Sequence, residues 1–144
     1  MTRLKVDDIK GIAGNLPQYD EELRRKMGST LRGIACHGVG IREEEILPLL
    51  APVQAAVVPI KSGKGIIEDF SQTVKAVLEH IGIRAFVTRQ TDVAGIAEAF
   101  EKKVSLIFAA DDNRFAAFNL KCCSLVDNAA ATGKGFAEIG RAHV

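Results

Sequence analysis

Two short polar clusters follow strand-like apolar runs, and both contain residue types that could bind a ligand. The first is Ser62-Gly63-Lys64-Gly65, which comes after the apolar run 55–60. Its glycines would let the backbone approach a ligand closely. A helix that begins directly after the cluster would point its first amides at a carboxylate, a phosphate or a substrate amide. The same motif is also typical of a plain strand-to-helix turn.

The second cluster is Asp111-Asp112-Asn113, which directly follows the apolar run 104–110. Adjacent carboxylates at the end of a strand could hold an ammonium group or coordinate Mg²⁺. They could equally cap the segment that follows, because Asp and Asn are common turn residues. The sequence lacks the Gly-x-x-x-x-Gly-Lys-Ser/Thr pattern of phosphate-binding loops, which disfavours magnesium-dependent phosphate transfer.

A nucleophilic or metal-bound site is not evident from the remaining residues. Cys36-His37 has no second Cys/His pair at ligand spacing, which indicates a packed cysteine beside a surface histidine. His80 falls in the last turn of an expected helix, where a histidine more often serves the helix dipole or lies at the surface. A disulfide between the adjacent Cys122 and Cys123 would be strained. We expect no catalytic residue and no metal site, and the sequence assigns no role to the cysteines.

The elements that must position the polar clusters begin after a helical segment, residues 1–54. Apolar residues there recur at helical spacing, and strand-like runs are absent. A first helix is expected to stop at Pro17, and a second to begin with Asp20 as its cap and end at Gly28. Ser29 is the expected cap of a third helix. A fourth carries three consecutive glutamates in its first turn, where carboxylates suit the helix dipole.

Residues 55–144 are expected to form a small α/β domain. The pattern predicts strands and helices in strict alternation, over residues 55–60, 66–81, 84–88, 92–103 and 104–110. This order implies right-handed crossovers and a parallel sheet with helices on both faces. The expected fold is therefore a three-layer, Rossmann-like α/β sheet with an N-terminal helical extension.

The helix caps and the strand ends of this α/β domain indicate where a ligand site would lie. Asp92 is the expected cap of the second helix, and Thr132 that of a last helix. Ligands of open parallel sheets bind beyond the carboxyl ends of the strands, where the strand order reverses. The clusters 62–65 and 111–113 would both lie there.

Composition narrows the class of protein. The 144 residues include 19 basic and 18 acidic ones, a formal net charge of +1. This balance argues against a nucleic-acid or membrane-surface partner, which normally requires a basic excess. No signal peptide and no apolar run long enough to span a bilayer are present, so we expect a cytoplasmic protein.

An ordered set of sequence blocks resembles the N-terminal domain of the pyrrolysine-biosynthesis dehydrogenase. The likeness covers residues 55–140 well and the helical start loosely, through Leu4 and Gly28. The blocks that carry it are Val58-Pro59-Ile60-Lys61-Ser62-Gly63-Lys64-Gly65-Ile66-Ile67, Phe70-Ser71, Asp92-Val93-Ala94-Gly95, Ala110-Asp111-Asp112-Asn113-Arg114-Phe115, Asn119-Leu120, Asn128, Thr132-Gly133 and Ala137-Glu138-Ile139.

The resemblance implies a function. In that family an enzyme uses NAD to oxidise an amine carbon of an isopeptide of lysine and a methylated ornithine. The N-terminal domain holds the substrate and a C-terminal Rossmann domain holds the nucleotide. By resemblance, Asp111 would anchor a substrate ammonium group, Asn128 would be a polar wall, and Leu4 would lie near the substrate. The other implied substrate-binding residues are Ser62, Gly63, Gly65, Asp112 and Asn113.

The chain ends at Val144, about where the family would continue into its nucleotide-binding half, and it lacks the Gly-x-Gly-x-x-Gly fingerprint. We therefore expect no cofactor in this chain, and NAD only with a separate Rossmann domain. Two classes of function remain. The favoured one is a substrate domain, inactive alone, with an exposed apolar face for its Rossmann partner. The alternative is a stand-alone binding or regulatory domain for a small amino-acid-like ligand, self-associating as a homo-oligomer.

Overall fold

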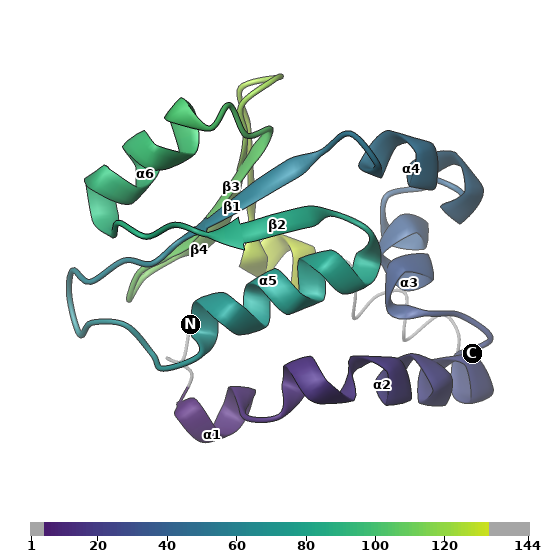
Figure 1. Cartoon of the computed structure of the whole chain (residues 1–144). Coiled ribbons are helices and arrows are strands. Elements are labelled where there is room, and N and C mark those ends of the chain that lie inside the picture. The colour runs from purple at the N-terminus through teal and green to yellow at the C-terminus, as the bar shows by residue number, and fades with distance from the viewer. Residues whose placement is uncertain (1–4, 133–144) are drawn as a thin grey trace.

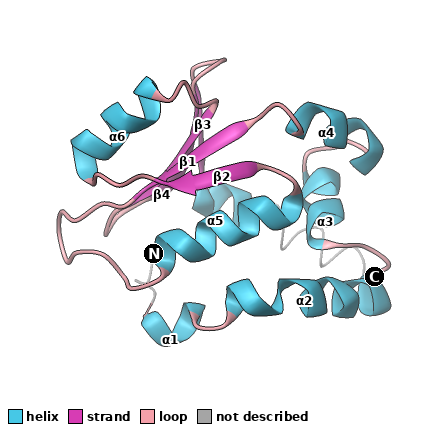
Figure 2. Cartoon of the chain, viewed as in Figure 1, coloured by secondary structure: helices cyan, strands magenta, loops and turns pink. Residues whose placement is uncertain are grey.

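A five-stranded sheet forms the centre of the computed structural model, which describes residues 5–132 (Figures 1 and 2). The helices are α1 (Val6–Ile9), α2 (Ile12–Met27), α3 (Leu31–Gly38), α4 (Glu43–Leu50), α5 (Phe70–Ile81) and α6 (Asp92–Glu101). The strands are β1 (Gln54–Val58), β2 (Arg84–Val87), β3 (Leu106–Ala110), β4 (Phe115–Asn119) and β5 (Ser124–Asp127). A further helical segment occupies residues 128–132, beginning before the predicted cap at Thr132.

The strand order is β2-β1-β3-β4-β5, and the sheet is mixed. β1 pairs in parallel with β2 and β3, whereas β3, β4 and β5 are antiparallel neighbours. The predicted α/β class with a helical N-terminal region is confirmed, and so are its three parallel strands. β4 and β5 were not predicted. The chain reverses at residues 111–114, where the Asp111 amide donates to the Arg114 carbonyl at 2.9 Å, and enters β4. A second turn, at residues 120–123, leads into β5.

β1 supplies both cores, because its successive side chains point to opposite faces of the sheet. Ala56 and Val58 are buried with Ala99 of α6 on one face. Ala55 and Val57 are buried with Leu78 of α5 on the other. α5 and α6 therefore cover opposite faces, as Figure 1 shows.

α1 and α2 form an outer layer on α5 (Figure 1). Ile9 of α1 is buried, and so are Leu16 and Leu23 of α2, which stand seven residues apart and therefore lie on one side of that helix, two turns from each other. The predicted stop at Pro17 is wrong, because α2 continues through it to Met27. Proline removes one amide from the helix, but the burial of Leu16 and Leu23 on either side of it offsets that loss.

Asp20 joins this outer layer to α5 and α3. Its Oδ2 lies 2.6 Å from Nε2 of His80 in α5, and its Oδ1 accepts the Leu31 amide at the start of α3 at 2.7 Å. The Asp20 and His80 side chains are only 14% and 21% exposed. Asp20 is thus mid-helix rather than the predicted cap of a second helix. His80 is a half-buried partner of Asp20, whereas the sequence suggested a residue that serves the helix dipole or lies at the surface.

The ends of α3 and α5 are also fixed by polar contacts. Thr30, not the predicted Ser29, caps α3 and accepts the Gly33 amide at 3.1 Å. Arg32 of α3 pairs with Glu43 of α4 at 2.8 Å and donates from Nη1 to the Ile81 carbonyl at 3.2 Å. One guanidinium therefore holds α4 and the last turn of α5 together.

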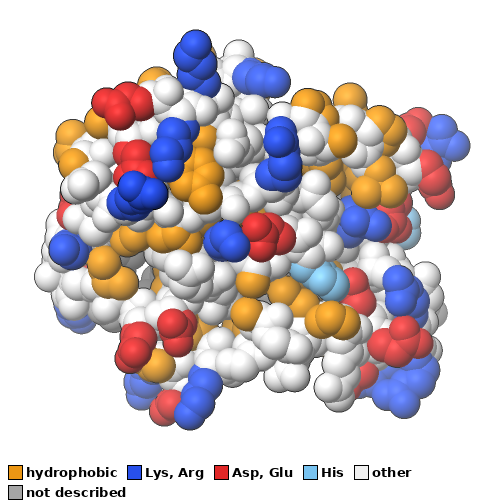
Figure 3. All heavy atoms as spheres, viewed as in Figure 1, with side chains coloured by type: hydrophobic (Ala, Val, Ile, Leu, Met, Phe, Trp, Pro, Cys, Tyr) orange, Lys and Arg blue, Asp and Glu red, His pale blue; other side chains and the backbone are white. Residues whose placement is uncertain are grey.

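α4 carries part of the exposed apolar surface. Leu47 and Leu49 are exposed there, and Figure 3 shows hydrophobic side chains gathered over this helix. Within residues 5–132, no helix combines the length and apolar character needed to cross a membrane.

The three cysteines are free thiols in different settings. Cys36 is buried in α3, as predicted, and burial followed by the nearby Glu43 carboxylate raises the pKa of its thiol. Cys122 and Cys123 are exposed in the turn between β4 and β5. They are not bonded to each other.

Candidate ligand site at the carboxyl ends of the parallel strands

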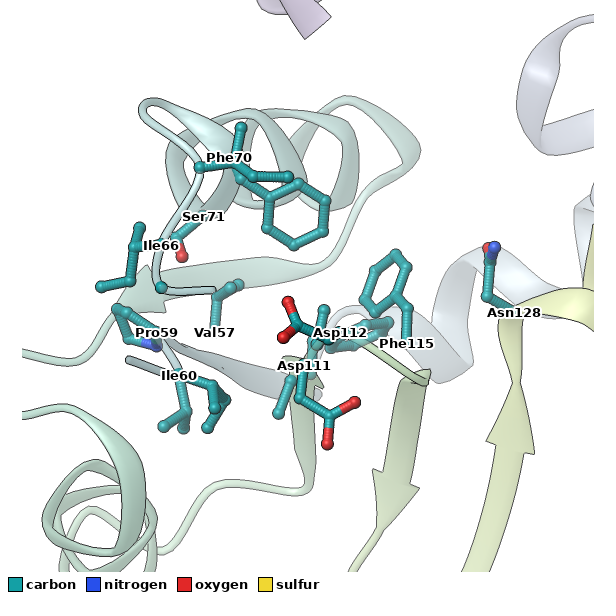
Figure 4. A pocket seen from close by; sticks show the side chains of 16 residues that line it. Val57, Pro59, Ile60, Ile66, Phe70, Ser71, Asp111, Asp112, Phe115 and Asn128 are labelled. Carbon is teal, nitrogen blue, oxygen red and sulfur yellow. The ribbon is translucent and has the colours of Figure 1, made fainter. Parts of the chain in front are cut away.

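A cavity of about 220 Å³ opens beyond the carboxyl ends of β1 and β3 (Figure 4). The chain leaves β1 through α5 toward β2 on one side and then crosses through α6 to β3 on the other. Such diverging connections open a crevice between neighbouring strand ends. Most of the lining is apolar, and the polar side chains on it belong to Ser71, Asp111, Asp112 and Asn128.

The wall nearest β1 is a loop, residues 59–69, rather than a tight turn. The predicted helix start at Ile66 is wrong, because α5 begins at Phe70. Gly63, Gly65 and Asp69 have φ values of 73°, 84° and 61°, a left-handed conformation that a right-handed helix cannot contain. α5 therefore does not begin directly after cluster 62–65, as the sequence predicted.

Two carboxylates from other parts of the chain hold this loop. Asp92 Oδ1 accepts the amides of Lys61 and Ser62 at 2.9 and 3.3 Å. Asp112 Oδ2 accepts the Lys64 amide at 2.7 Å. The loop is thus fastened to both α6 and the end of β3.

Asp92 differs from its predicted role as a helix cap. Thr91 is the N-cap of α6, and Asp92 is its first residue. A hydrogen bond from the Thr91 side chain, and then those from the Lys61 and Ser62 amides, lower the pKa of Asp92. Its carboxylate is therefore ionised at neutral pH and acts as the loop's acceptor.

Gly63 lies directly against Asp112. A Cβ at Gly63 would stand 2.9 Å from Asp112 Cγ and overlap its Oδ2. Gly65 has a similar φ, but a Cβ there would meet no atom within 4 Å. Of these two glycines, Gly63 is therefore the one whose missing side chain permits a close approach to a carboxylate.

The adjacent acids Asp111 and Asp112 point in different directions. Asp111 Oδ1 accepts the amides of Asn113 and Arg114, each at 2.8 Å, and so caps the turn into β4. These two bonds lower the pKa of Asp111. In Figure 4 the Asp112 carboxylate points toward the side of Phe70 and Phe115, whereas that of Asp111 points away from them.

Two aromatic rings line the cavity beside the strand ends. Phe70 begins α5 and Phe115 begins β4, and their ring centroids lie 5.4 Å apart with an interplanar angle of 72°. This edge-to-face arrangement is favourable between aromatic quadrupoles. Ser71 follows Phe70 on the same wall, and Asn128 begins the helical segment at the far side.

The structure brings together part of the predicted site. Among the predicted residues, those that line the cavity are Gly65, Asp111, Asp112 and Asn128. Those that lie beside it in the two loops, without lining it, are Ser62, Gly63 and Asn113. Leu4 lies outside the described residues. No group of three or more His, Cys, Asp or Glu side chains in the described part of the chain could hold a metal ion.

Sequence reasoning missed the two aromatic rings and the role of Asp92. Phe70, Ser71 and Phe115 stood in the blocks that carry the resemblance, which was the available signal, but no role was assigned to them. The contact from Asp92 to Lys61 spans about thirty residues and had no local signature.

A second apolar hollow, of about 400 Å³, lies on the α6 face of the sheet. Phe100 of α6 and Phe118 of β4 line it and are 58% and 41% exposed. We call this surface the α6 groove; it is lined by Ile60, Ile96, Phe100, Ile107, Ala109, Ala110, Asp111, Arg114, Ala116, Phe118 and Leu120.

The mixed sheet, its helices on both faces and the cavity at its strand ends define an α/β domain with a candidate ligand site. The model of the family described as pyrrolysine biosynthesis protein PylD, N-terminal domain, matches residues 8–126. The chain belongs to this family.

Two curated relatives carry the name pyrrolysine synthase. The one from Methanosarcina acetivorans is 35% identical over 139 residues, which cover 96% of this chain and 51% of the relative. The one from Methanosarcina barkeri is 33% identical over 141 residues, covering 96% of this chain and 50% of the relative. The chain thus spans about half the length of the curated relatives it matches.

Proposed function

We propose that this chain is the substrate-binding domain of a pyrrolysine-forming dehydrogenase and is inactive without an NAD-binding half. The observation that carries the proposal is the cavity at the ends of β1 and β3. It combines apolar walls with carboxylates in a chain that belongs to the PylD N-terminal domain family.

The composition of the cavity suits an amino-acid-like ligand. Apolar side chains such as Ile66 and Phe108 would contact an alkyl arm, and a carboxylate would face an ammonium group. Ser71 and Asn128 would hydrogen-bond the remaining polar atoms of the ligand. The proposed substrate is the isopeptide of lysine and a methylated ornithine.

The residues proposed to contact this ligand are those expected from the resemblance: Leu4, Ser62, Gly63, Gly65, Asp111, Asp112, Asn113 and Asn128. Asp111 already accepts two backbone amides through Oδ1. A role for Asp111 as the ammonium anchor therefore has to coexist with its role in the turn.

The α6 groove supports a protein partner. The relatives are about twice as long as this chain, and an exposed apolar groove is what a domain shows where another domain covers it. We propose that the groove docks a nucleotide-binding domain of Rossmann type, which would bring NAD. A homo-oligomer through the same surface is the alternative.

Calorimetric titration tests the proposal. The isopeptide should bind the purified chain saturably, free lysine more weakly, and NAD not at all, because the expected nucleotide fingerprint is absent from the sequence. Binding of NAD by this chain alone, or no binding of either amino-acid ligand, would contradict it. Sedimentation of the same sample would separate a monomer from the homo-oligomer.

A further inference from the structure

We propose that Cys122 and Cys123 form a two-thiolate site for a soft monovalent cation, copper(I). The two residues are adjacent in the turn 120–123 between β4 and β5, and both thiols are free and exposed. The site is separate from the cavity, because β4 begins beside the cavity with Phe115 and enters the turn only after its last residue, Asn119. Figure 1 shows the turn, in yellow-green, at the end of the sheet away from the loop 59–69.

The turn that carries the two cysteines is fixed by hydrogen bonds. Asn119 Oδ1 accepts the amides of Lys121 and Cys122 at 3.0 and 3.3 Å. The Leu120 amide donates to the Ser105 carbonyl at 2.9 Å, which attaches the turn to the chain just before β3. The backbone around the thiols is therefore ordered before an ion binds, and this lowers the entropic cost of binding.

The backbone of Cys123 also affects the direction of its side chain. Successive side chains of a regular strand point to opposite faces, which would hold two neighbouring thiols apart. Cys123 instead has a φ of 51°, in the left-handed region, so the alternation of the strand does not apply to this pair. Ser124 Oγ lies 3.0 Å from Cys122 Sγ and can donate to that sulfur once it carries negative charge.

The adjacency of the two cysteines disfavours a disulfide between them. The Cα atoms of neighbouring residues are about 3.8 Å apart across a trans peptide, whereas disulfides usually join Cα atoms about 4.4–6.8 Å apart. A strained disulfide is easily reduced. Two metal–sulfur bonds, each about 2.3 Å long for zinc, make a longer bridge than one S–S bond of about 2.0 Å. The pair is therefore better suited to bridging by an ion than to oxidation.

The donor set selects the ion. Thiolates favour soft ions such as copper(I). Zinc and iron–sulfur centres ordinarily take four protein ligands, and within residues 5–132 no group of three His, Cys, Asp or Glu side chains could hold a metal ion. Copper(I) is stable with two thiolates. On binding, each thiol releases its proton to water and forms one S–Cu bond, and the copper remains monovalent.

This site was not expected from the sequence, because a four-coordinate centre requires further Cys or His ligands at fixed spacing. Two thiolates on one turn meet the smaller requirement of copper(I). Because both thiols are exposed, the ion would be open to exchange with other thiols, as at a site that receives and releases metal rather than one that holds it permanently.

The chain offers matched variants for a test. Cys122→Ser and Cys123→Ser each remove one sulfur from the turn and keep a side chain of similar size. Cys36→Ala removes the buried thiol of α3 instead, so it controls for the number of thiols in the chain. Iodoacetamide, which needs only one thiol, should still modify the remaining turn thiol in each serine variant.

The test is titration of the chain with copper(I), supplied without oxygen as its acetonitrile complex, in competition with the coloured chelator bicinchoninate. The wild type should bind one ion per chain, and its sedimentation should not change. Each serine variant should lower the copper affinity at least about 100-fold, the upper end of what loss of an outer-shell partner costs. Cys36→Ala should retain the affinity, and Zn²⁺ should bind the wild type more weakly than copper(I).

Three results would overturn the site. An unchanged copper affinity in either serine variant would mean that the two thiols do not act together. One ion per two chains, with a copper-dependent dimer, would mean that the ion joins the turns of two copies. Equal affinity for Zn²⁺ would exclude a two-coordinate site. Matching thermal unfolding midpoints of the exposed-turn variants would show that a loss of affinity reflects the missing sulfur. Binding of lysine or the isopeptide is tested separately, so the proposed function and this site can fail independently.

Discussion

The two faces of the sheet are covered to different depths. On the α5 face, α5 lies on the sheet and α1 and α2 lie on α5, with Asp20 and Arg32 joining the helices (Figure 1). On the other face α6 covers β1, while Phe118 of β4 and the directly opposite Leu125 of β5 remain 41% and 48% exposed.

The difference in covering suggests that the two faces of the sheet have different roles, one in stability and one in association. The α5 face contains the outer layer of α1 and α2 and the half-buried contact between Asp20 and His80, so it is suited to stabilise the fold. Val57 and Phe108 of its core also line the cavity, which makes the candidate site an extension of that core. The α6 face is thinner and apolar, which suits association with another domain.

The largest effect is expected where α6 meets β1. A Cβ at Gly95 would lie 2.6 Å from the Gln90 carbonyl oxygen and 2.7 Å from Val58 Cγ1, so Gly95→Ala must displace the helix. We expect it to lower the free energy of unfolding by about 2–3 kcal/mol, as overpacking does, measured by urea denaturation.

Gly14→Ala in α2 is the matched control for this substitution. A Cβ at Gly14 would meet no atom within 4 Å, so the gain in helix propensity should raise stability by about 0.5–1 kcal/mol. If Gly95→Ala left the free energy of unfolding unchanged, α6 would be only loosely packed on β1, and the α6 face would be covered even less than the structure indicates.

The next effect tests the α5 face through Asp20. Asp20→Ala removes the acceptor of the Leu31 amide and the partner of His80, both half-buried, and should cost about 2 kcal/mol in a denaturant titration. Glu21→Ala, at the neighbouring exposed pair with Arg24, should change stability by less than about 0.5 kcal/mol. Equal effects would show that the second layer contributes little.

The contribution of Asp20 should depend on pH. Burial alone would raise the pKa of Asp20, but the bonds from Leu31 and His80 outweigh burial and hold the pKa below its ordinary value of 3.8. The stabilisation is therefore complete above pH 3.8 and is lost as the pH falls through the lowered pKa. The stability difference between wild type and Asp20→Ala should shrink in that acidic range, and a constant difference would contradict it.

A smaller effect is expected in the loop at the mouth of the cavity. Gly63→Ala and Gly65→Ala share the cost of a left-handed conformation, but only the first pushes against Asp112. The difference in their unfolding free energies should be about 1 kcal/mol, the low end for overpacking. Lysine titration should show the weaker affinity for Gly63→Ala, and the reverse order would place the ligand away from Asp112.

The smallest change in stability is expected on the α6 face. Val93 is 80% exposed, so Val93→Gln should change the free energy of unfolding by less than about 0.5 kcal/mol. It should nevertheless reduce the fluorescence of an apolar dye bound to the native chain, because Val93 continues the helix face of Ile96 and Phe100. Tyr19→Gln on α2 should leave the dye signal unchanged; an equal loss would remove the distinction between the two faces.

The parallel strands and their connecting helices could be predicted from the sequence, because each has a recognisable apolar pattern within its own segment. β1 and β3 are apolar runs bounded by polar turns, and the segments between them are amphipathic. β4 was not predictable, because Phe115 to Asn119 contains two alanines that suit a helix equally well. Its strand conformation comes from pairing with β3, which no local pattern encodes.

The sequence predicted that the site lies at the carboxyl ends of β1 and β3, but it did not predict how the side chains are oriented there. Polar residues after β1 and β3 had to lie at one edge of a parallel sheet, which placed Gly65, Asp111 and Asp112 near one another. Both acids line the cavity, but the direction in which each carboxylate points depends on the turn geometry at 111–114. The spacing of residues in the sequence does not reveal this direction.

The turn at Asp111 also has a consequence for the order in which the chain assembles. β3 pairs with β4 directly across that turn, where Ala110 is opposite Phe115. Its pairing with β1, where Leu106 is opposite Ala55, joins segments that are separated in the chain by α5, β2 and α6. Hairpins close in about 1–10 μs, whereas distant parallel pairing must first overcome loop entropy. The β3–β4 hairpin should therefore form early and present an edge on which β1 is later placed, so the carboxylate of Asp111 should influence the refolding rate.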